Sequence, residues 1–306
     1  MFSLERLRVL QAVSRHGSVV AAAEALYVTT SAISQQLAKL ERESGQQLVA
    51  RSGRGIRLTD AGRLLAGHAE QVMAQLDLAR ADLEAHRGKA VGEVLLGAFP
   101  TAARGLLPSA LAALSVEHPQ LRPRLREMEA DESLRRLRRG EADLAVVLDW
   151  HNRTLPLPGG MATAPLLEDP VDLALPAGHP LAGRRPVALA ELAEEEWISW
   201  PDGEFCHEWL LQTLRAEGVE PKLSHTAAEH PTQLALVAAG MGVAAAPRLG
   251  RGPVPDGVAT VPVRDPMHRH VYAVWREDAD RRPSIRAVVA ALEQAARTSA
   301  EPAPLP

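Results

Sequence analysis

The chain has 306 residues, of which 46% are hydrophobic and 24% are charged, so it is long enough for about two globular domains. Its single cysteine, Cys206, excludes an intrachain disulfide and fits a reducing, cytoplasmic location. No run approaches about 18 uninterrupted apolar residues, and the charged N-terminal stretch is a poor match to a signal peptide, so we expect neither a membrane span nor export.

Charge is distributed unevenly along the chain. Residues 1–58 carry eight Lys or Arg and four acidic residues, a net charge of +4, whereas the other 26 basic and 34 acidic residues give the remainder a net charge of −8. A basic head on an acidic body indicates a head that binds a polyanion. Chance is the competing interpretation, because +4 over 58 residues is modest.

The first segment predicts three short helices. Apolar residues recur at helical spacing from Leu4 to Val13, and Gly17 can end that helix in a left-handed conformation. Ser18 can cap a second helix over residues 19–26, and Thr29 can cap a third. Two short helices that lead into a third are typical of a helix-turn-helix, with the third as recognition helix.

The third helix has an unusual polar face. Its apolar stripe is Ile33, Leu37 and Leu40, and the positions from Thr29 to Leu40 include no acidic residue. A carboxylate there would be repelled by phosphates, whereas Gln can pair with adenine edges and Ser can bond to several bases. This pattern predicts that the helix enters the major groove of double-stranded DNA.

Residues 48–51 and 56–58 predict two short strands around the turn 52–55, which together form a hairpin or wing. Its arginines suit contacts to phosphate or to the minor groove. A nucleotide-binding glycine loop is less favoured, because the third glycine is missing and no helix follows directly. The full set of expected DNA contacts is Ser18, Thr29, Thr30, Ser31, Ser34, Gln35, Lys39, Arg51, Arg54 and Arg57.

A long helix is expected next, capped by Thr59 and running to about residue 87. Apolar residues on it alternate spacings of four and three, which predicts a coiled-coil seam and a homodimer. The alternative is a helix that packs on its own chain, which the alanines in the seam keep open. The expected dimerisation residues are Leu65, Ala69, Val72, Leu76, Ala79 and Leu83. Residues 88–91 then form a hinge.

From Gly92 onward, predicted strands alternate with helices. Strands are expected at 93–98, 121–129, 142–148, 171–176, 197–200, 221–227, 242–247 and 269–276, and helices at 102–118, 131–141, 204–218, 231–240 and 284–296. This order predicts an α/β domain with a mostly parallel sheet covered by helices. Residues 298–306 read as a disordered tail.

Over nearly its whole length the chain resembles the LysR-type transcriptional regulators. The resemblance rests on the head pattern from "FSLERLRVLQAVSRHGSVVAAAEAL" to "RLTDAG", and on "GAFPTAARGLLP", "GEADLAVV" and "VAAGMGVAAAPR" in the body. It implies a winged helix-turn-helix over 1–58, a dimerising linker helix over 59–87, and a two-lobed α/β effector domain, like periplasmic binding proteins, over 92–297. Lobe one would comprise 92–165 and 268–297, lobe two 166–267, with crossings near Pro165 and Asp265. Such proteins often form tetramers, and RNA polymerase is a further candidate partner.

Ligands of open parallel sheets bind beyond the strand ends, where helix N-termini point. Three segments qualify here: 99–101, 199–202 and 229–232. A ligand anion could accept from Thr101 or His230. Helix capping is an equally favoured interpretation of Thr101, and a solvated histidine at a helix start is the slightly favoured interpretation of His230. The expected effector contacts are Phe99, Pro100, Thr101, Ser199, Trp200, His230 and Thr232.

No catalytic or metal-binding pattern stands out. Cys206 has no second cysteine to resolve an oxidised thiol, so we interpret it as a packed, inert thiol. His268 and His270 share a strand face but lack an acid or thiol pattern, so they are interpreted as surface histidines, with no metal or other cofactor. The basic run 134–139 reads as a solvated helix face.

Two hypotheses follow. The first is a regulator, not an enzyme, whose DNA binding responds to a small, anionic effector between the lobes. The second is a small-molecule-binding or enzymatic α/β protein whose N-terminal helices serve only to dimerise. The second needs a catalytic constellation, which the sequence lacks.

Overall fold

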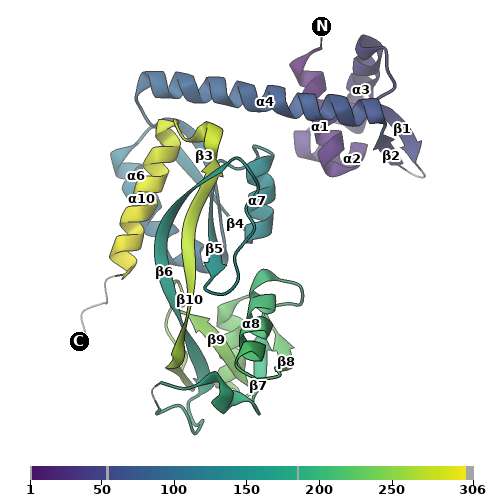
Figure 1. Ribbon diagram of the computed structural model, residues 1–306. Helices are drawn as coiled ribbons and strands as arrows, with labels where there is room; N and C mark the ends of the chain where they lie inside the picture. The colour runs from purple at the N-terminus through teal and green to yellow at the C-terminus, as the bar shows by residue number, and fades with distance from the viewer. Residues whose placement is uncertain (1, 53–54, 185, 301–306) are drawn as a thin grey trace. The chain divides into compact units, whose positions relative to one another are not determined.

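A computed structural model describes residues 2–52, 55–184 and 186–300. The chain divides into two compact units, 1–83 and 84–306. The first is a small helical head with a β-hairpin, and the second is an α/β domain (Figure 1).

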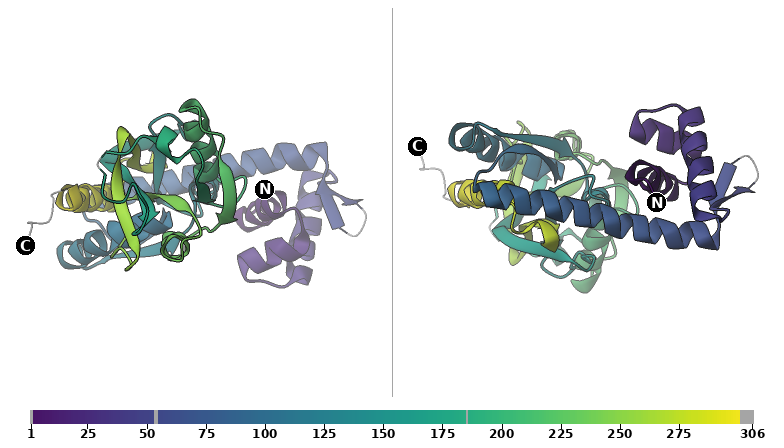
Figure 2. Two further views of the ribbon diagram at one scale, coloured as in Figure 1. Left: turned by 90° about the horizontal axis from the view of Figure 1, so that it is seen from below. Right: turned by 90° about the horizontal axis from the view of Figure 1, so that it is seen from above.

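The head is built from α1 (Leu4–His16), α2 (Val19–Leu26) and α3 (Thr30–Ser44) around one apolar core. The expected caps are present: the Ala21 amide donates to Ser18 Oγ at 3.1 Å, and the Ala32 amide to Thr29 Oγ1 at 3.2 Å. Gly17 ends α1 at φ +70°. Figure 2 shows these helices gathered beside the first part of α4 (Asp60–Arg87).

The expected wing is an antiparallel hairpin of β1 (Val49–Ser52) and β2 (Gly55–Leu58), in which Val49 pairs with Leu58. Thr59 caps α4, because its Oγ1 accepts from the Gly62 amide at 3.0 Å. A Cβ atom on Gly62 would lie 2.0 Å from the Leu48 carbonyl oxygen. A glycine at this position therefore lets α4 start directly against the wing.

The expected seam on α4 divides into two parts. Leu65 and Ala69 pack into the core of the head, and Ala69 is fully buried. Val72, Leu76, Ala79 and Leu83 are exposed. The own-chain alternative therefore holds for the first two positions, whereas the last four form an apolar stripe that the described head leaves uncovered.

The second unit contains one eight-stranded sheet in the order β4-β3-β5-β10-β6-β9-β7-β8. The strands are β3 (Gly92–Ala98), β4 (Leu121–Glu127), β5 (Leu144–Trp150), β6 (Met161–Pro176), β7 (Glu196–Ser199), β8 (Lys222–Thr226), β9 (Val243–Pro247) and β10 (Val258–Arg276). The expected mostly parallel sheet is mixed instead. β3 is parallel to β4 and β5, and β7 is parallel to β8 and β9, but β10 is antiparallel to β5 and β6, and β6 is antiparallel to β9.

The helices of this unit are α5 (Pro100–Gly105), α6 (Leu107–Glu117), α7 (Ala130–Arg138), α8 (Phe205–Ala216), α9 (His230–Ala238) and α10 (Pro283–Ala300). The single helix expected over 102–118 is broken at Leu106, where α5 ends and α6 begins. The tail expected from residue 298 starts later, because α10 continues to Ala300; residues 301–306 lie outside the described part.

The long strands β6 and β10 pass through both lobes (Figure 1). On β10, residues 269–275 pair with β5 of lobe one; on β6, residues 171–174 pair with β9 of lobe two. The expected crossing positions, Pro165 and Asp265, lie within these two strands. The lobes are thus joined by a pair of hydrogen-bonded strands.

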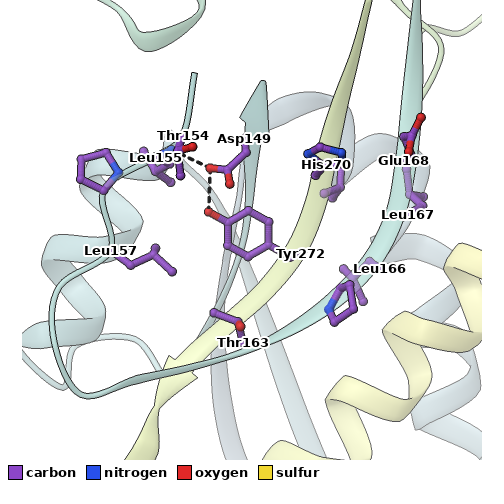
Figure 3. A pocket seen from close by; sticks show the side chains of 13 residues that line it. Asp149, Thr154, Leu155, Leu157, Thr163, Leu166, Leu167, Glu168, His270 and Tyr272 are labelled. Carbon is purple, nitrogen blue, oxygen red and sulfur yellow. Dashed lines mark hydrogen bonds between the residues drawn. The ribbon is translucent and has the colours of Figure 1, made fainter. Parts of the chain in front are cut away.

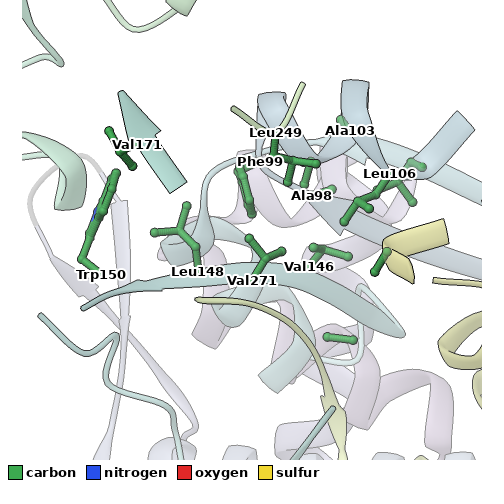
Figure 4. Packing of buried hydrophobic residues seen from close by; sticks show 14 of the residues in the cluster. Ala98, Phe99, Ala103, Leu106, Val146, Leu148, Trp150, Val171, Leu249 and Val271 are labelled. Atoms are coloured by element: carbon green, nitrogen blue, oxygen red, sulfur yellow. The ribbon is translucent and has the colours of Figure 1, made fainter. Parts of the chain in front are cut away.

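The apolar core of this unit continues from one lobe into the other. In Figure 4, Val146 and Leu148 of β5 pack toward α5 and the residues beside it. At the other end of the same cluster lie Trp150, the last residue of β5, and Val171 of β6. Trp150 stacks on Trp209 of α8 with ring centroids 3.5 Å apart, and Trp200 meets both edge-on. Within the described residues, no helix is both long enough and apolar enough to span a membrane.

Candidate functional site

The polar face of α3 is open to solvent. Thr29, Thr30, Ser31, Ser34, Gln35 and Lys39 are all exposed, whereas the apolar stripe at Ile33, Leu37 and Leu40 is buried. Thr29 Oγ1 and Ser31 Oγ lie 2.9 Å apart, and Ser34 Oγ donates to the Thr30 carbonyl at 2.9 Å. No such bond ties Gln35 or Lys39 among the described residues, so their side chains remain available to a ligand.

The acidic residues of α3 are turned toward the protein. Glu41 Oε1 accepts from the amides of Leu48 and Val49, at 2.8 and 3.1 Å, and so fixes the start of the wing. Glu43 pairs with Arg6 of α1. The carboxylates that follow the predicted contact face therefore have structural partners away from it.

The remaining expected DNA contacts divide as follows. Ser18 is partly buried and its hydroxyl caps α2, so it has a structural role. Arg57 is exposed on β2. Arg51 belongs to β1, but its side chain, like all of Arg54, lies outside the described part of the protein.

A small pocket lies between the lobes of the second unit. Its volume is about 30 Å³, enough for little more than one water molecule. Residues at the starts of α5, α7, α8 and α9 line it, so the positive ends of four helices converge there. The lining is Phe99, Pro100, Thr101, Arg104, Glu129, Leu148, Trp200, Cys206, Ala228, Glu229, His230 and Arg269.

A buried ion pair supports the wall of this pocket, which Arg269 lines. Arg269 Nε on β10 donates to Asp169 Oδ2 on β6 at 2.7 Å, and its Nη2 donates to Thr101 Oγ1 at 2.7 Å. The other Asp169 oxygen accepts from the Leu249 amide at 2.8 Å. Because the Thr101 oxygen accepts from Arg269, its own proton can point toward a ligand.

The titratable groups around the pocket are strongly affected by burial. Burial, the nearby Arg269 and Arg104 lower the pKa of His230 to about 3, so its ring is neutral at pH 7. Removal of water, followed by the Glu204 carboxylate, raises the pKa of Glu129 to about 6. Burial and Glu129 raise the pKa of the Cys206 thiol to about 12. The thiol is therefore almost fully protonated at neutral pH.

The pocket contains five of the seven expected effector contacts: Phe99, Pro100, Thr101, Trp200 and His230. Thr232 is exposed and does not line it, and Ser199 is fully buried. Ser199 Oγ instead lies 3.1 Å from Nδ1 of the buried His207, which is also 3.0 Å from the Trp200 carbonyl oxygen. This Ser–His pair fastens α8 to the end of β7 and is closed to a substrate.

Sequence reasoning missed Arg104, Glu129 and Arg269. Thr101 was selected because it lies between a strand end and a helix N-terminus. The same criterion could have found Glu129, which is the N-cap residue of α7. Nothing local marks Arg269, because it reaches the pocket only through strand pairing with residues about a hundred positions away.

A larger hollow, of about 840 Å³, lies on lobe one beside β5, β6 and β10 (Figure 3). Asp149 Oδ1 in its wall accepts from the Tyr272 hydroxyl at 3.0 Å and the Leu155 amide at 2.6 Å. His270 and Glu168 stand at its edge. The structure thus supplies the acid that the sequence interpretation of His268 and His270 lacked, since Glu168 approaches both histidines.

A helix-turn-helix head joined to a two-lobed domain with a pocket between its lobes defines a class, the ligand-responsive DNA-binding regulators. Comparison with known families agrees. Residues 4–63 match the model "Bacterial regulatory helix-turn-helix protein, lysR family", and residues 87–297 match "LysR substrate binding domain". The chain belongs to the LysR family of transcriptional regulators, and it is not an enzyme.

Relatives at the level of individual proteins include peroxide regulators. The chain is 34% identical over 244 residues to a protein of Mycobacterium leprae named "Probable hydrogen peroxide-inducible genes activator", which covers 79% of this chain and 76% of that protein. Full-length OxyR from Pseudomonas aeruginosa has a similar fold, with a TM-score of 0.71 at 22% identity over 96% of this chain and 98% of that one. A hydrogen-peroxide-bound OxyR mutant from Corynebacterium glutamicum gives 0.62 at 25% identity over 97% and 93%.

Proposed function

We propose that this regulator responds to a small carboxylate that also carries a hydrogen-bond donor, as hydroxy acids and amino acids do. The observation that carries the proposal is the convergence, in one pocket, of the Thr101 hydroxyl, two arginines and four helix starts. These groups favour an anionic end of the ligand. Glu129 in the same wall favours a donor at the other end.

The charges that line the pocket favour a ligand with a carboxylate at one end and a hydrogen-bond donor at the other over a ligand with anionic groups alone. The Arg269 guanidinium is already neutralised by Asp169, and Glu229 adds a further carboxylate to the lining. A ligand with anionic groups alone would meet both glutamates. A hydroxyl or ammonium group that faces Glu129 removes that conflict, because it donates to the carboxylate.

The small volume of the pocket indicates how the ligand acts. With about 30 Å³ available, a hydroxy acid enters only if the lobes separate or rotate. A ligand that binds one lobe arrangement better than another shifts the protein toward that arrangement. We propose that this shift alters how the recognition helices of a dimer or tetramer are spaced on DNA.

Thermal unfolding of the full-length protein with a panel of small carboxylates tests the effector proposal. A true ligand raises the Tm of the native protein but not that of Thr101→Val, which keeps the shape and loses the hydroxyl. Thr232→Val is the matched control, because Thr232 is exposed and lies outside the pocket. An equal Tm increase in native protein and Thr101→Val contradicts the assignment.

On the DNA side, we propose that the exposed residues of α3 contact base edges in the major groove and that Arg57 contacts the backbone. The observation is the buried apolar stripe opposite a face whose neighbouring carboxylates are engaged elsewhere. A gel-shift titration with DNA from the region upstream of the gene, across a salt series, tests it. Binding that shows no salt dependence contradicts the proposal.

Oxidant sensing through Cys206 is a second candidate, favoured by the names of the relatives and by the thiol in the pocket wall. Two observations oppose it: the pKa of the thiol is raised to about 12, and the chain has no second cysteine. The thiolate is the reactive form, so reaction with peroxide should be slow. If peroxide changes DNA binding of the native protein but not of Cys206→Ser, this second function replaces the first.

A further inference from the structure

Glu168, His268 and His270 form a compact group on the two strands that connect the lobes. Among the described residues, one ligand atom from each lies within 4.8 Å of the others. His268 Nδ1 is 3.9 Å from Glu168 Oε1, and the two histidine ring centroids are 5.0 Å apart. The three side chains come from β6 and β10, and their grouping depends on how these strands pair.

Strand register explains why the group forms. His270 pairs directly with Glu168 on one side and with Asp149 of β5 on the other, so these three residues form a row on one face of the sheet. Figure 3 shows that row along the edge of the hollow. His268 is two residues from His270, and so it projects from the same face.

A further imidazole, outside this group of three, is close by. His151 follows β5, and its ring centroid is 5.3 Å from that of His268. Its backbone amide donates to the His268 carbonyl at 3.1 Å, which holds the two residues side by side. His151 Nδ1 lies 3.4 Å from the same carbonyl oxygen, so its Nε2 is the nitrogen left for a metal ion.

We propose that Glu168, His268 and His270, with His151 as a fourth ligand, bind a divalent transition-metal ion of the zinc, cobalt or nickel class. Two or three imidazoles and one carboxylate suit these ions better than magnesium or calcium, which prefer oxygen ligands. Tetrahedral zinc ligands lie about 3.4 Å apart, so the ligand atoms of Glu168, His268 and His270, which are all at least partly exposed, must approach one another by little more than about an ångström, a shift that rotamer changes supply.

The position of this site gives it a regulatory role. Glu168 and Asp169 are adjacent on β6, as are His268, Arg269 and His270 on β10, and alternate residues face opposite sides of the sheet. Asp169 and Arg269 form the ion pair that supports the wall of the interlobe pocket. A metal ion on the other side would pin β6 to β10 at the same point, and so would stiffen the connection between the lobes.

Isothermal titration calorimetry of the untagged full-length protein with zinc sulfate tests the site. We expect one zinc ion per chain in the native protein. Removal of one ligand should weaken affinity at least about 10-fold in each of Glu168→Gln, His268→Ala and His270→Ala. His225→Ala is the matched control, since His225 is exposed on β8, outside the group. Visible absorption of the cobalt-substituted protein gives a second readout, because its band reports how many ligands the metal has.

The site is overturned by native-protein binding that is weaker than about 1 mM. It is also overturned if Glu168→Gln and His270→Ala bind as tightly as native protein, or if His225→Ala loses as much affinity as they do. All ligands are at least partly exposed, so unchanged circular dichroism should accompany each substitution. The titration contains neither DNA nor effector, so its outcome is independent of the function proposed above.

Discussion

The two sites of this protein are built in different ways. The predicted DNA contacts on α3 lie within eleven consecutive residues, from Thr29 to Lys39, and one helix periodicity decides which of them are exposed. The interlobe pocket combines Thr101 with Arg269, which Asp169 holds in place, and these residues come together only through strand pairing and helix docking. A site on one element can be predicted from local sequence, whereas a site assembled from several elements needs the tertiary fold.

The largest effect should come from breaking the assembled site. Asp169→Ala leaves the Arg269 guanidinium buried without its partner, and we expect a loss of about 3–5 kcal/mol in the free energy of unfolding. Urea denaturation of the full-length protein measures this loss. Arg215→Ala is the control, because it removes a solvent-exposed pair with Glu220 and should leave the free energy of unfolding nearly unchanged. Equal losses in the two variants would show that the central ion pair does not organise the pocket.

Gly250→Ala tests how closely the lobes approach. Gly250 has φ +63°, and an added Cβ would lie 2.1 Å from the Thr101 carbonyl oxygen. We expect a cost of about 1–3 kcal/mol, together with a wider pocket and an altered response to effector. Gly159→Ala is the control, because nothing lies within 4 Å of its added Cβ. A fully stable Gly250→Ala protein would mean that this contact between α5 and the loop after β9 adjusts at little cost.

For the local site, Gln35→Ala should weaken binding to the specific DNA site by about 1–3 kcal/mol while nonspecific binding is retained. Arg57→Ala should weaken all sequences similarly and reduce the salt slope by about 1. Fluorescence anisotropy with specific and scrambled duplexes separates these patterns. Gln46→Ala, at an exposed position just beyond α3, is the control. An unchanged specific affinity in Gln35→Ala would remove this residue from the groove.

The exposed stripe on α4 belongs to neither kind of site, because we expect a second copy of the chain to cover it. Leu76→Asp should raise the dimer dissociation constant at least about tenfold, equivalent to 1.4 kcal/mol. Analytical ultracentrifugation measures the change. Leu64→Asp is the control, since Leu64 is 68% exposed and does not lie on the stripe. A similar change in both variants would point to a nonspecific effect of charge on the helix.

The smallest effect concerns pH. The pKa of His230 is about 3 in the folded protein, against an ordinary value of 6.5, so the unfolded chain takes up the proton first. Stability from this residue is therefore complete above about pH 6.5 and falls as the pH drops toward 3. Between pH 7 and pH 5.5, native protein should lose about 1 kcal/mol more than His230→Gln. Glu129 acts in the opposite direction, because its raised pKa favours the folded state as the pH falls.

Comparing His230→Gln with native protein at each pH cancels the contribution of Glu129, which both proteins contain. Urea denaturation at the two pH values gives the required free energies. An identical pH dependence in the two proteins would mean that the histidine is accessible to water and belongs to a more open pocket.

Within the α/β unit, the order of elements was predictable and their pairing was not. Alternating apolar runs located β3, β4, β5, β7, β8 and β9, and helical periodicity located α7, α8, α9 and α10. The antiparallel course of β6 and β10 was missed, because register between residues about a hundred positions apart leaves no local pattern. The break between α5 and α6 was missed as well; Gly105 there lies against Leu249 and Gly250, a contact that periodicity does not report.

The sequence by itself determined the class of the protein, the caps of α2, α3 and α4, the exposed face of the recognition helix and five of the seven expected residues in the pocket wall. These follow from hydrogen bonds and periodicities that act over a few residues. Only the tertiary structure decided that Leu65 and Ala69 belong to the core of the head. It also decided that Arg269 faces the pocket beside Asp169, and that Glu168 joins His268 and His270 on the opposite side. Those contacts arise from pairing and packing between distant segments, and no local sequence pattern shows which distant partner each residue contacts.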